Sequence, residues 1–169
     1  ADNTAALALV KADLGTWVLG GNNTYTGTTT ITGGTLKLKA SAAASNIIGA
    51  GAVIFNSNAT TQTAGGTLEL VGLAGSNVLE SLGALTPTQG MNTVKLTPGS
   101  GGTASLTFTS LGTVAGTAGV NFITPNAATN IITLTGQAAT TATTLPGSGR
   151  LYINGSNFAR INASAQVVV

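Results

Sequence analysis

The stretch GTWVLGGNNTYTGTTTITGGTLKL, residues Gly15–Leu38, decides how this chain folds. It reads as short strands over Thr16–Leu19, Thr28–Thr32 and Thr35–Leu38, divided by turns of glycine and asparagine. Glycine, and to a lesser degree asparagine, adopts positive φ at low cost, and alternate side chains of a strand share one face. The pattern therefore predicts a compact unit of short strands joined by tight turns.

Part of this unit returns later in the chain. The hexapeptide GGTLKL at Gly33–Leu38 is echoed by GGTLEL at Gly65–Leu70, an offset of 32 residues. Looser echoes follow at Ser105–Phe108, Val120–Ile123 and Ile132–Leu134. Short strands that cannot bury their apolar faces alone are typical of stacked repeat units.

The composition favours ordered β structure over disorder. Only 6% of the 169 residues are charged, the net charge is +2, and Val, Ile and Leu recur throughout. Disordered chains usually combine high net charge with few β-branched residues. Ten charged residues provide no basic patch that neutralises several phosphates, so we expect no nucleic-acid partner. No apolar run approaches the length of about 18 residues that a spanning helix needs, so we expect no membrane insertion.

Leu9–Lys11 together with the opening stretch resembles the autotransporter-associated β-strand repeat of long bacterial surface and secreted proteins. The similarity covers residues 9–39, and NTYTGTTTITGGTL is its most diagnostic part. The resemblance implies a passenger-type, right-handed parallel β-helix and a secreted or cell-surface location.

We expect one all-β domain over residues 1–169, with the clearest repeat at 9–39 and a related return at 65–70. Short strands separated by turns fit either a right-handed parallel β-helix (β-solenoid) or a β-sandwich. The repeated Gly-Gly-Thr-Leu and the polar turns favour the β-solenoid. Pro87 predicts a loop, and Asn154-Gly155 predicts a terminal hairpin within residues 150–162.

The residue types offer little catalytic chemistry. The carboxylates are Asp2, Asp13, Glu69 and Glu80, and glycoside cleavage needs two of them facing each other across a sugar bond. Nucleophilic catalysis of the Ser-His-Asp or Cys-His kind is excluded because the chain has no His and no Cys. Nothing resembles an acidic calcium repeat. We therefore expect no enzyme activity, no metal and no cofactor.

Two kinds of surface contact are expected from the strand pattern. Glu69 alternates with Leu68 and Leu70 and so faces solvent, and Lys37 occupies the equivalent place in the earlier repeat. If these repeats are neighbours, Lys37 and Glu69 form an inter-coil ion pair worth about 0–1 kcal/mol. Tyr25 lies in an Asn-rich turn, so we expect its ring to be exposed and to offer a glycan contact. Trp17 alternates with inward Leu19, which favours burial in the core.

The sequence favours a structural cell-surface protein whose partners are copies or further repeats of itself. End strands carry unpaired backbone groups, so subunits or successive repeats are expected to associate end to end into a fibre or surface layer. The candidate contacts are Leu7, Leu9, Val167, Val168 and Val169. The alternative is an adhesin or glycan-binding module of a larger passenger, with carbohydrate as the partner.

Overall fold

The computed structural model describes residues 6–42, 47–57, 65–138, 150–155 and 157–168. Every regular element within these ranges is a β-strand. None of the described residues forms a helix long and apolar enough to cross a bilayer.

Parallel strands build three sheets. Sheet A holds β1 (Leu9–Lys11), β3 (Thr29–Ile31), β5 (Val53–Asn56) and the first part of β8 (Leu85–Thr97). Sheet B holds β2 (Thr16–Gly20), β4 (Thr35–Lys39), β6 (Thr67–Val71), the second part of β8, β10 (Ala118–Ile123) and β12 (Arg150–Ile153). Sheet C holds β7 (Asn77–Leu82), β9 (Thr103–Phe108) and β11 (Ile132–Leu134).

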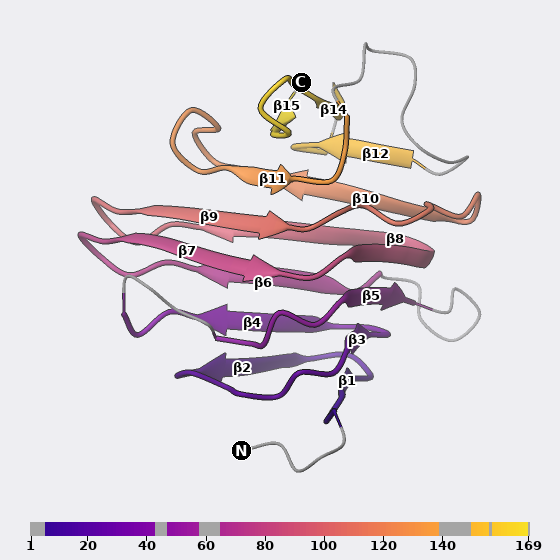
Figure 1. Ribbon diagram of the computed structural model, residues 1–169, viewed down its shortest axis with the longest axis horizontal. Helices are drawn as coiled ribbons and strands as arrows, with labels where there is room; N and C mark the ends of the chain where they lie inside the picture. Colours follow the sequence, from indigo (N-terminus) through magenta and orange to yellow (C-terminus); the bar gives the residue numbers. More distant parts are fainter. Residues whose placement is uncertain (1–5, 43–46, 58–64, 139–149, 156, 169) are drawn as a thin grey trace.

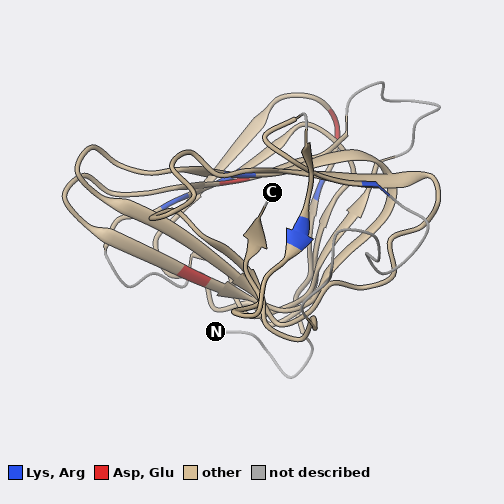
Figure 2. Cartoon of the chain, turned by 90° about the horizontal axis from the view of Figure 1, so that it is seen from above, with Lys and Arg blue, Asp and Glu red and all other residues tan. Residues whose placement is uncertain are grey.

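The chain alternates between sheets A and B from β1 to β6 and from β7 onward also passes through sheet C, and one such passage around the stack is here called a circuit. Successive circuits lie one above another from β1 and β2 at the bottom to β12 at the top (Figure 1). Seen from above, their ribbons overlie one another (Figure 2). Thr35 pairs with Thr67, and Thr67 pairs with Thr93, so equivalent positions recur after 32 and then 26 residues.

The core consists of inward side chains stacked in register. One column through sheet B contains Trp17, Leu36, Leu68, Val94, Phe122 and Ile153. All of its members except Trp17 are fully buried. Full burial of one such side chain is worth about 1.5–3 kcal/mol, so stacking is the main source of stability of the circuits.

The loop expected at Pro87 is wrong, because Pro87 lies inside β8 and is paired with Phe55. The pairing register between β5 and β8 shifts beside this residue, and Gly90 has a φ of 74°. A proline is tolerated at such an irregularity because no regular ladder bond is required of its nitrogen. The irregularity turns β8 from sheet A into sheet B.

The two ends of the stack differ. At the C-terminal end, β12 pairs antiparallel with β13 (Asn157–Phe158), and β14 (Arg160–Ile161) pairs antiparallel with β15 (Val167–Val168). The turn residues Asn154 and Gly155 both have positive φ, as an Asn-Gly hairpin turn requires. At the N-terminal end, within the described ranges, β1 pairs only with β3 and β2 only with β4. Within the part of the chain that the structure describes, the first circuit therefore presents a free edge.

Lys11 is a buried cation in the first circuit. Its Nζ donates hydrogen bonds to the carbonyl oxygens of Ala12 at 2.7 Å, Asp13 at 2.7 Å and Gly33 at 3.1 Å. The same Nζ lies 5.6 Å from the centroid of the Trp17 ring. Lys11 thus satisfies carbonyls that two turns leave without strand partners, which compensates for burying its charge.

Glu80 is a buried anion in sheet C, in the inward column that continues to Leu106 and Ile132. Its two carboxylate oxygens accept hydrogen bonds from the backbone N–H groups of Ile47 and Ile48, each at 3.0 Å. Burial raises the pKa of Glu80, although these two hydrogen bonds favour the charged form and oppose that shift. The Glu80 carboxylate therefore links sheet C to the preceding circuit. Among the described residues, that preceding circuit has no strand of its own in sheet C.

Candidate functional site: the outer face of sheet B

Outward side chains of sheet B form columns that run along the stack, because parallel strands pair in register. One column contains Thr16, Thr35, Thr67 and Thr93, and it continues to Asn121 and Tyr152. The next contains Val18, Lys37, Glu69, Lys95 and Ile123. These columns make up a mostly polar surface that we call the outer face of sheet B.

A charged ladder occupies the middle of this face. Glu69 lies between two lysines, with Lys37 Nζ 3.2 Å from its Oε2 and Lys95 Nζ 3.1 Å from its Oε1. Thr97 Oγ1 donates a further hydrogen bond of 2.6 Å to Glu69 Oε1. The structure thus brings the two residues of the expected ion pair together and adds two partners, Lys95 and Thr97.

Glu69 is buried by its own partners, so the expectation that it faces solvent freely is wrong. Burial alone would raise the pKa of Glu69, but the hydrogen bonds from Thr97, Lys95 and Lys37 and the charge of Lys95 lower it overall. The lysine side chains remain 34% and 40% exposed. Solvent therefore screens the pairs, and each contributes about 0–1 kcal/mol.

Positive charge gathers on this face. Of the six Lys and Arg residues of the chain, Lys37, Lys39, Lys95 and Arg150 point outward from sheet B. Among the described acidic residues, Glu69 alone lies on the same face, so its net charge is +4 − 1 = +3. Figure 2 marks these charges on the ribbon in blue and red. The overall charge of +2 is thus concentrated rather than spread evenly.

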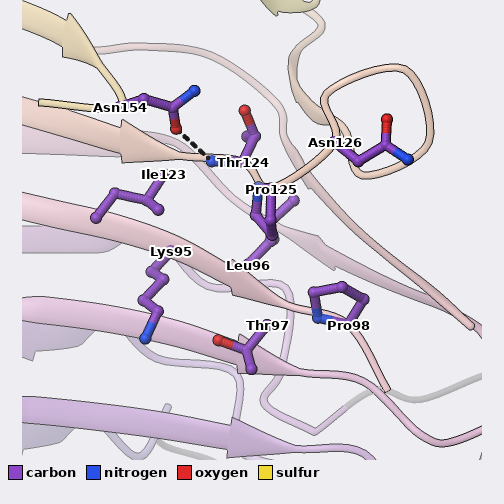
Figure 3. A pocket seen from close by; sticks show the side chains of 9 residues that line it. All are labelled: Lys95, Leu96, Thr97, Pro98, Ile123, Thr124, Pro125, Asn126 and Asn154. Carbon is purple, nitrogen blue, oxygen red and sulfur yellow. Dashed lines mark hydrogen bonds between the residues drawn. The ribbon is translucent and has the colours of Figure 1, made fainter. Parts of the chain in front are cut away.

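A groove opens beside Lys95, where β8 and β10 end (Figure 3). It has a volume of about 490 Å³ and is lined by Lys95, Leu96, Thr97, Pro98, Ile123, Thr124, Pro125, Asn126 and Asn154. Asn154 Oδ1 accepts a hydrogen bond of 3.1 Å from the Thr124 backbone N–H. The lining combines apolar rings and methyl groups with two side-chain amides and one ammonium group, a mixture that suits a polar organic ligand.

An aromatic pair lies at the upper end of the face. The rings of Tyr152 and Phe158 stack with their centroids 5.5 Å apart and their planes at 23°. Phe158 is 70% exposed. Tyr152 stands two residues before Asn154, which follows β12 and lines the groove, so the aromatic pair and the groove lie near each other along the chain.

Tyr25 does not have the exposure that the sequence predicts. It is buried, and its hydroxyl lies 2.8 Å from Thr29 Oγ1. Burial raises the pKa of Tyr25. The turn that holds Tyr25 folds its ring into the core, which removes the exposed ring face that a glycan contact requires.

The expectation of a buried Trp17 is also wrong, since its side chain is 46% exposed. Trp17 does continue the inward column of Leu36, but it belongs to the outermost described strand of sheet B. No described circuit covers the other side of its ring, which explains the exposure.

The candidate assembly residues lie at both ends of the stack. Leu7 is 64% exposed and Leu9 packs partly against the core. Val167 is buried in the hairpin with β14, Val168 is half-buried, and Val169 lies outside the described residues. Of these residues, Leu7 presents the most exposed apolar surface.

Lys95 and Thr97 are site residues that sequence reasoning missed. The segment TVKL at Thr93–Leu96 repeats the pattern of TLEL at Thr67–Leu70, and this similarity was the available signal. This signal is weak, because Met91 and Asn92 precede TVKL at the place where Gly-Gly precedes the earlier repeats. Within the described ranges, no group of three or more acidic residues is placed to hold a metal ion.

Comparison with known proteins gives a local similarity. Residues 9–38 match the passenger-associated-transport-repeat. A segment of 38 residues, 22% of this chain, is 58% identical to part of the adhesin BmaC autotransporter of Brucella suis biovar 1 (strain 1330). The aligned segment covers 1% of that protein, so the chain spans only a very small share of its length. No solved structure matches the chain.

Proposed function

We propose that this chain is a secreted or cell-surface passenger segment, which folds as a right-handed parallel β-helix and serves a structural, non-catalytic role. The passenger repeat at residues 9–38 supports the location. The observation that carries the fold is the in-register parallel stacking of three sheets. A β-sandwich would instead be built from antiparallel sheets.

The carboxylates support a non-catalytic role. Glu69 is held in the charged ladder, and Glu80 is buried against backbone N–H groups. Asp13 lies in a turn with a φ of 59°, and Asp2 is outside the described residues. Hydrolysis of a glycosidic bond needs two carboxyl groups about 5–10 Å apart around one substrate. The carboxylates of Glu69 and Glu80 are thus engaged in structural contacts.

The free edge of the first circuit supports end-to-end association with a second copy or with further circuits of the same kind. Five of the exposed large apolar residues lie there: Leu7, Val10, Leu14, Trp17 and Val18. Edge strands with unpaired backbone groups readily accept another strand. An added circuit would extend sheets A and B and cover the open face of Trp17.

A charge placed on the edge strand β1 tests whether the chain associates end to end. Val10 and Leu79 point outward from β1 and β7 and are 53% and 52% exposed. We expect the purified chain to form larger species as its concentration rises, measured by sedimentation velocity and imaged by electron microscopy. Val10→Lys is expected to abolish them and Leu79→Lys to leave them unchanged. A chain that stays strictly monomeric at high concentration would contradict end-to-end association.

Adhesion is a second candidate function. The relative named above is an adhesin, and the passenger repeat matches residues 9–38 of this chain. The outer face of sheet B, with its groove and exposed aromatic ring, favours a binding role independently of that similarity.

A further inference from the structure

We propose that the outer face of sheet B binds an acidic polysaccharide, a linear sugar polymer that carries carboxylate or sulfate groups at regular intervals. The inference deepens the second candidate function, because it gives the ligand a chemical class and a place on the molecule.

The cations of this face remain available to a ligand. Lys37 and Lys95 each place one Nζ against Glu69, but an ammonium group has three donors and both side chains are more than a third exposed. Lys39 and Arg150 are exposed at the ends of β4 and β12. An anionic polymer therefore meets four cations and one acid that is already saturated by its neighbours.

The stacking of circuits spreads these cations over several strands of the face. Neighbouring strands of a sheet lie about 4.8 Å apart, so Lys37 and Lys95, which flank Glu69 in one column, are separated by about twice that distance along the stack. Lys39 and Arg150 lie in other columns, toward opposite ends of the strands. A polymer that carries anions along its length is long enough to reach cations spread in this way. A compact anion would contact one or two of the cations.

The aromatic pair and the groove favour a sugar over a simple polyanion. The exposed ring of Phe158, backed by Tyr152, offers an apolar surface to the C–H face of a sugar ring. The groove next to Lys95 provides the side-chain amides of Asn126 and Asn154 for hydroxyl groups. Stacking, amide donors and cations on one surface match the three kinds of group that an acidic sugar carries.

Single-stranded nucleic acid also combines anions with stacking rings, and the test includes it for that reason. Its grooves usually stack several bases on successive aromatic side chains. Among the described residues of this face, Phe158 alone presents an exposed ring, because Tyr152 is covered by Phe158. The sugar polymer is therefore the better match.

The test is a titration of the purified chain with polygalacturonate, dextran and a thymidine oligonucleotide, by isothermal calorimetry at low and moderate salt. We expect saturable binding of polygalacturonate that weakens with salt, and none of dextran. The double variant Lys39→Gln with Arg150→Gln is expected to weaken binding by about tenfold or more. Phe158→Ala is expected to weaken it by about fivefold, since the stacking surface is lost.

Arg160→Gln is the matched control, because it removes an exposed cation that belongs to β14 and not to sheet B. It is expected to change the affinity by less than about twofold, whereas an equal loss would mean nonspecific attraction and overturn the proposal. Tighter binding of the oligonucleotide, or no effect of Phe158→Ala, would also overturn it. Circular dichroism confirms that each variant is folded. Adhesion to cells without polygalacturonate binding would leave the second candidate function standing and reject this ligand.

Discussion

At the scale of single residues, polar groups in the core decide where the circuits are held together. Lys11 and Glu80 both occupy inward positions that would otherwise hold apolar side chains. Each bonds to backbone groups of turns rather than to an opposite charge. A buried charge is tolerated when its hydrogen bonds are complete, so these residues fix the turns more strictly than an apolar residue would.

Glu80 gives the stability of the protein a pH dependence of unusual sign. Because its pKa is raised above the ordinary value of 4.5, the folded state binds more protons than the unfolded state between that value and the raised one. The contribution of Glu80 is therefore fully present below pH 4.5 and is lost as the pH rises through the raised pKa. We expect the stability difference between wild type and Glu80→Gln to shrink over this range.

The measurement is urea denaturation of both proteins at a series of pH values from acidic to neutral. At the acidic end, Glu80→Gln is expected to lower the free energy of unfolding by about 1–3 kcal/mol. In this variant the side-chain N–H₂ group faces one of the two backbone N–H donors and cannot accept its hydrogen bond. A difference in the free energy of unfolding between the two proteins that is the same at every pH would contradict the raised pKa of Glu80.

Thr124 has a buried hydroxyl that finds no hydrogen-bond partner among the described residues. Thr124 follows β10 at an inward position and is 2% exposed. Thr124→Val keeps the shape and removes the unsatisfied group, so we expect the free energy of unfolding to rise by about 1 kcal/mol. Thr97→Val is the matched control and is expected to lower it, since Thr97 donates to Glu69. Thermal unfolding of both variants checks the pair, and a destabilised Thr124→Val would contradict the prediction.

At the scale of the strands, the charged ladder couples β4, β6 and β8 across three circuits. Glu69→Gln leaves Lys37 and Lys95 without the charge between them, so we expect a loss of about 1 kcal/mol that becomes smaller at high salt. Because the pKa of Glu69 is lowered, its contribution is present above pH 4.5 and is lost as the pH falls through the lowered value.

Denaturation of wild type and Glu69→Gln at low and high salt measures this contribution. The pH slopes caused by Glu69 and Glu80 have opposite signs, which separates the two residues in one set of experiments. A loss that does not depend on salt would show that Glu69 acts through packing and not through charge.

The sequence predicts the first strands well because local signals agree there. Glycine turns and alternating side chains place β2, β3 and β4 within a residue or two of the expected ranges. The prediction fails where the structure depends on a neighbouring circuit. The continuation of β8 through Pro87 rests on a register shift against β5, and no local pattern announces it.

In the candidate site, too, some contacts follow from local sequence patterns and others depend on neighbouring strands. The pairing of Lys37 with Glu69 follows from two similar hexapeptides, whereas the aromatic pair depends on a hairpin that folds Phe158 back onto Tyr152. Leu79 is 52% exposed, because Glu80 takes the inward position of β7. The sequence does not predict this orientation of β7, since a charged residue is not expected in a core.

At the scale of the whole molecule, the two ends of the stack differ in their strand pairing. The antiparallel pairs β12–β13 and β14–β15 cover the C-terminal end, and they interrupt the parallel ladder that another circuit would extend. The N-terminal edge retains that ladder in β1 and β2. If the chain associates end to end as proposed, we expect the added strands to pair with β1 and β2.

The exposed indole at this edge has a spectroscopic consequence. Trp17 is the single tryptophan of the chain, so its emission reports on one place in the molecule. Water now reaches almost half of its surface, and a circuit added below β2 would exclude that water and shift the emission to shorter wavelength. The emission of Trp17 would therefore report directly on the proposed end-to-end association.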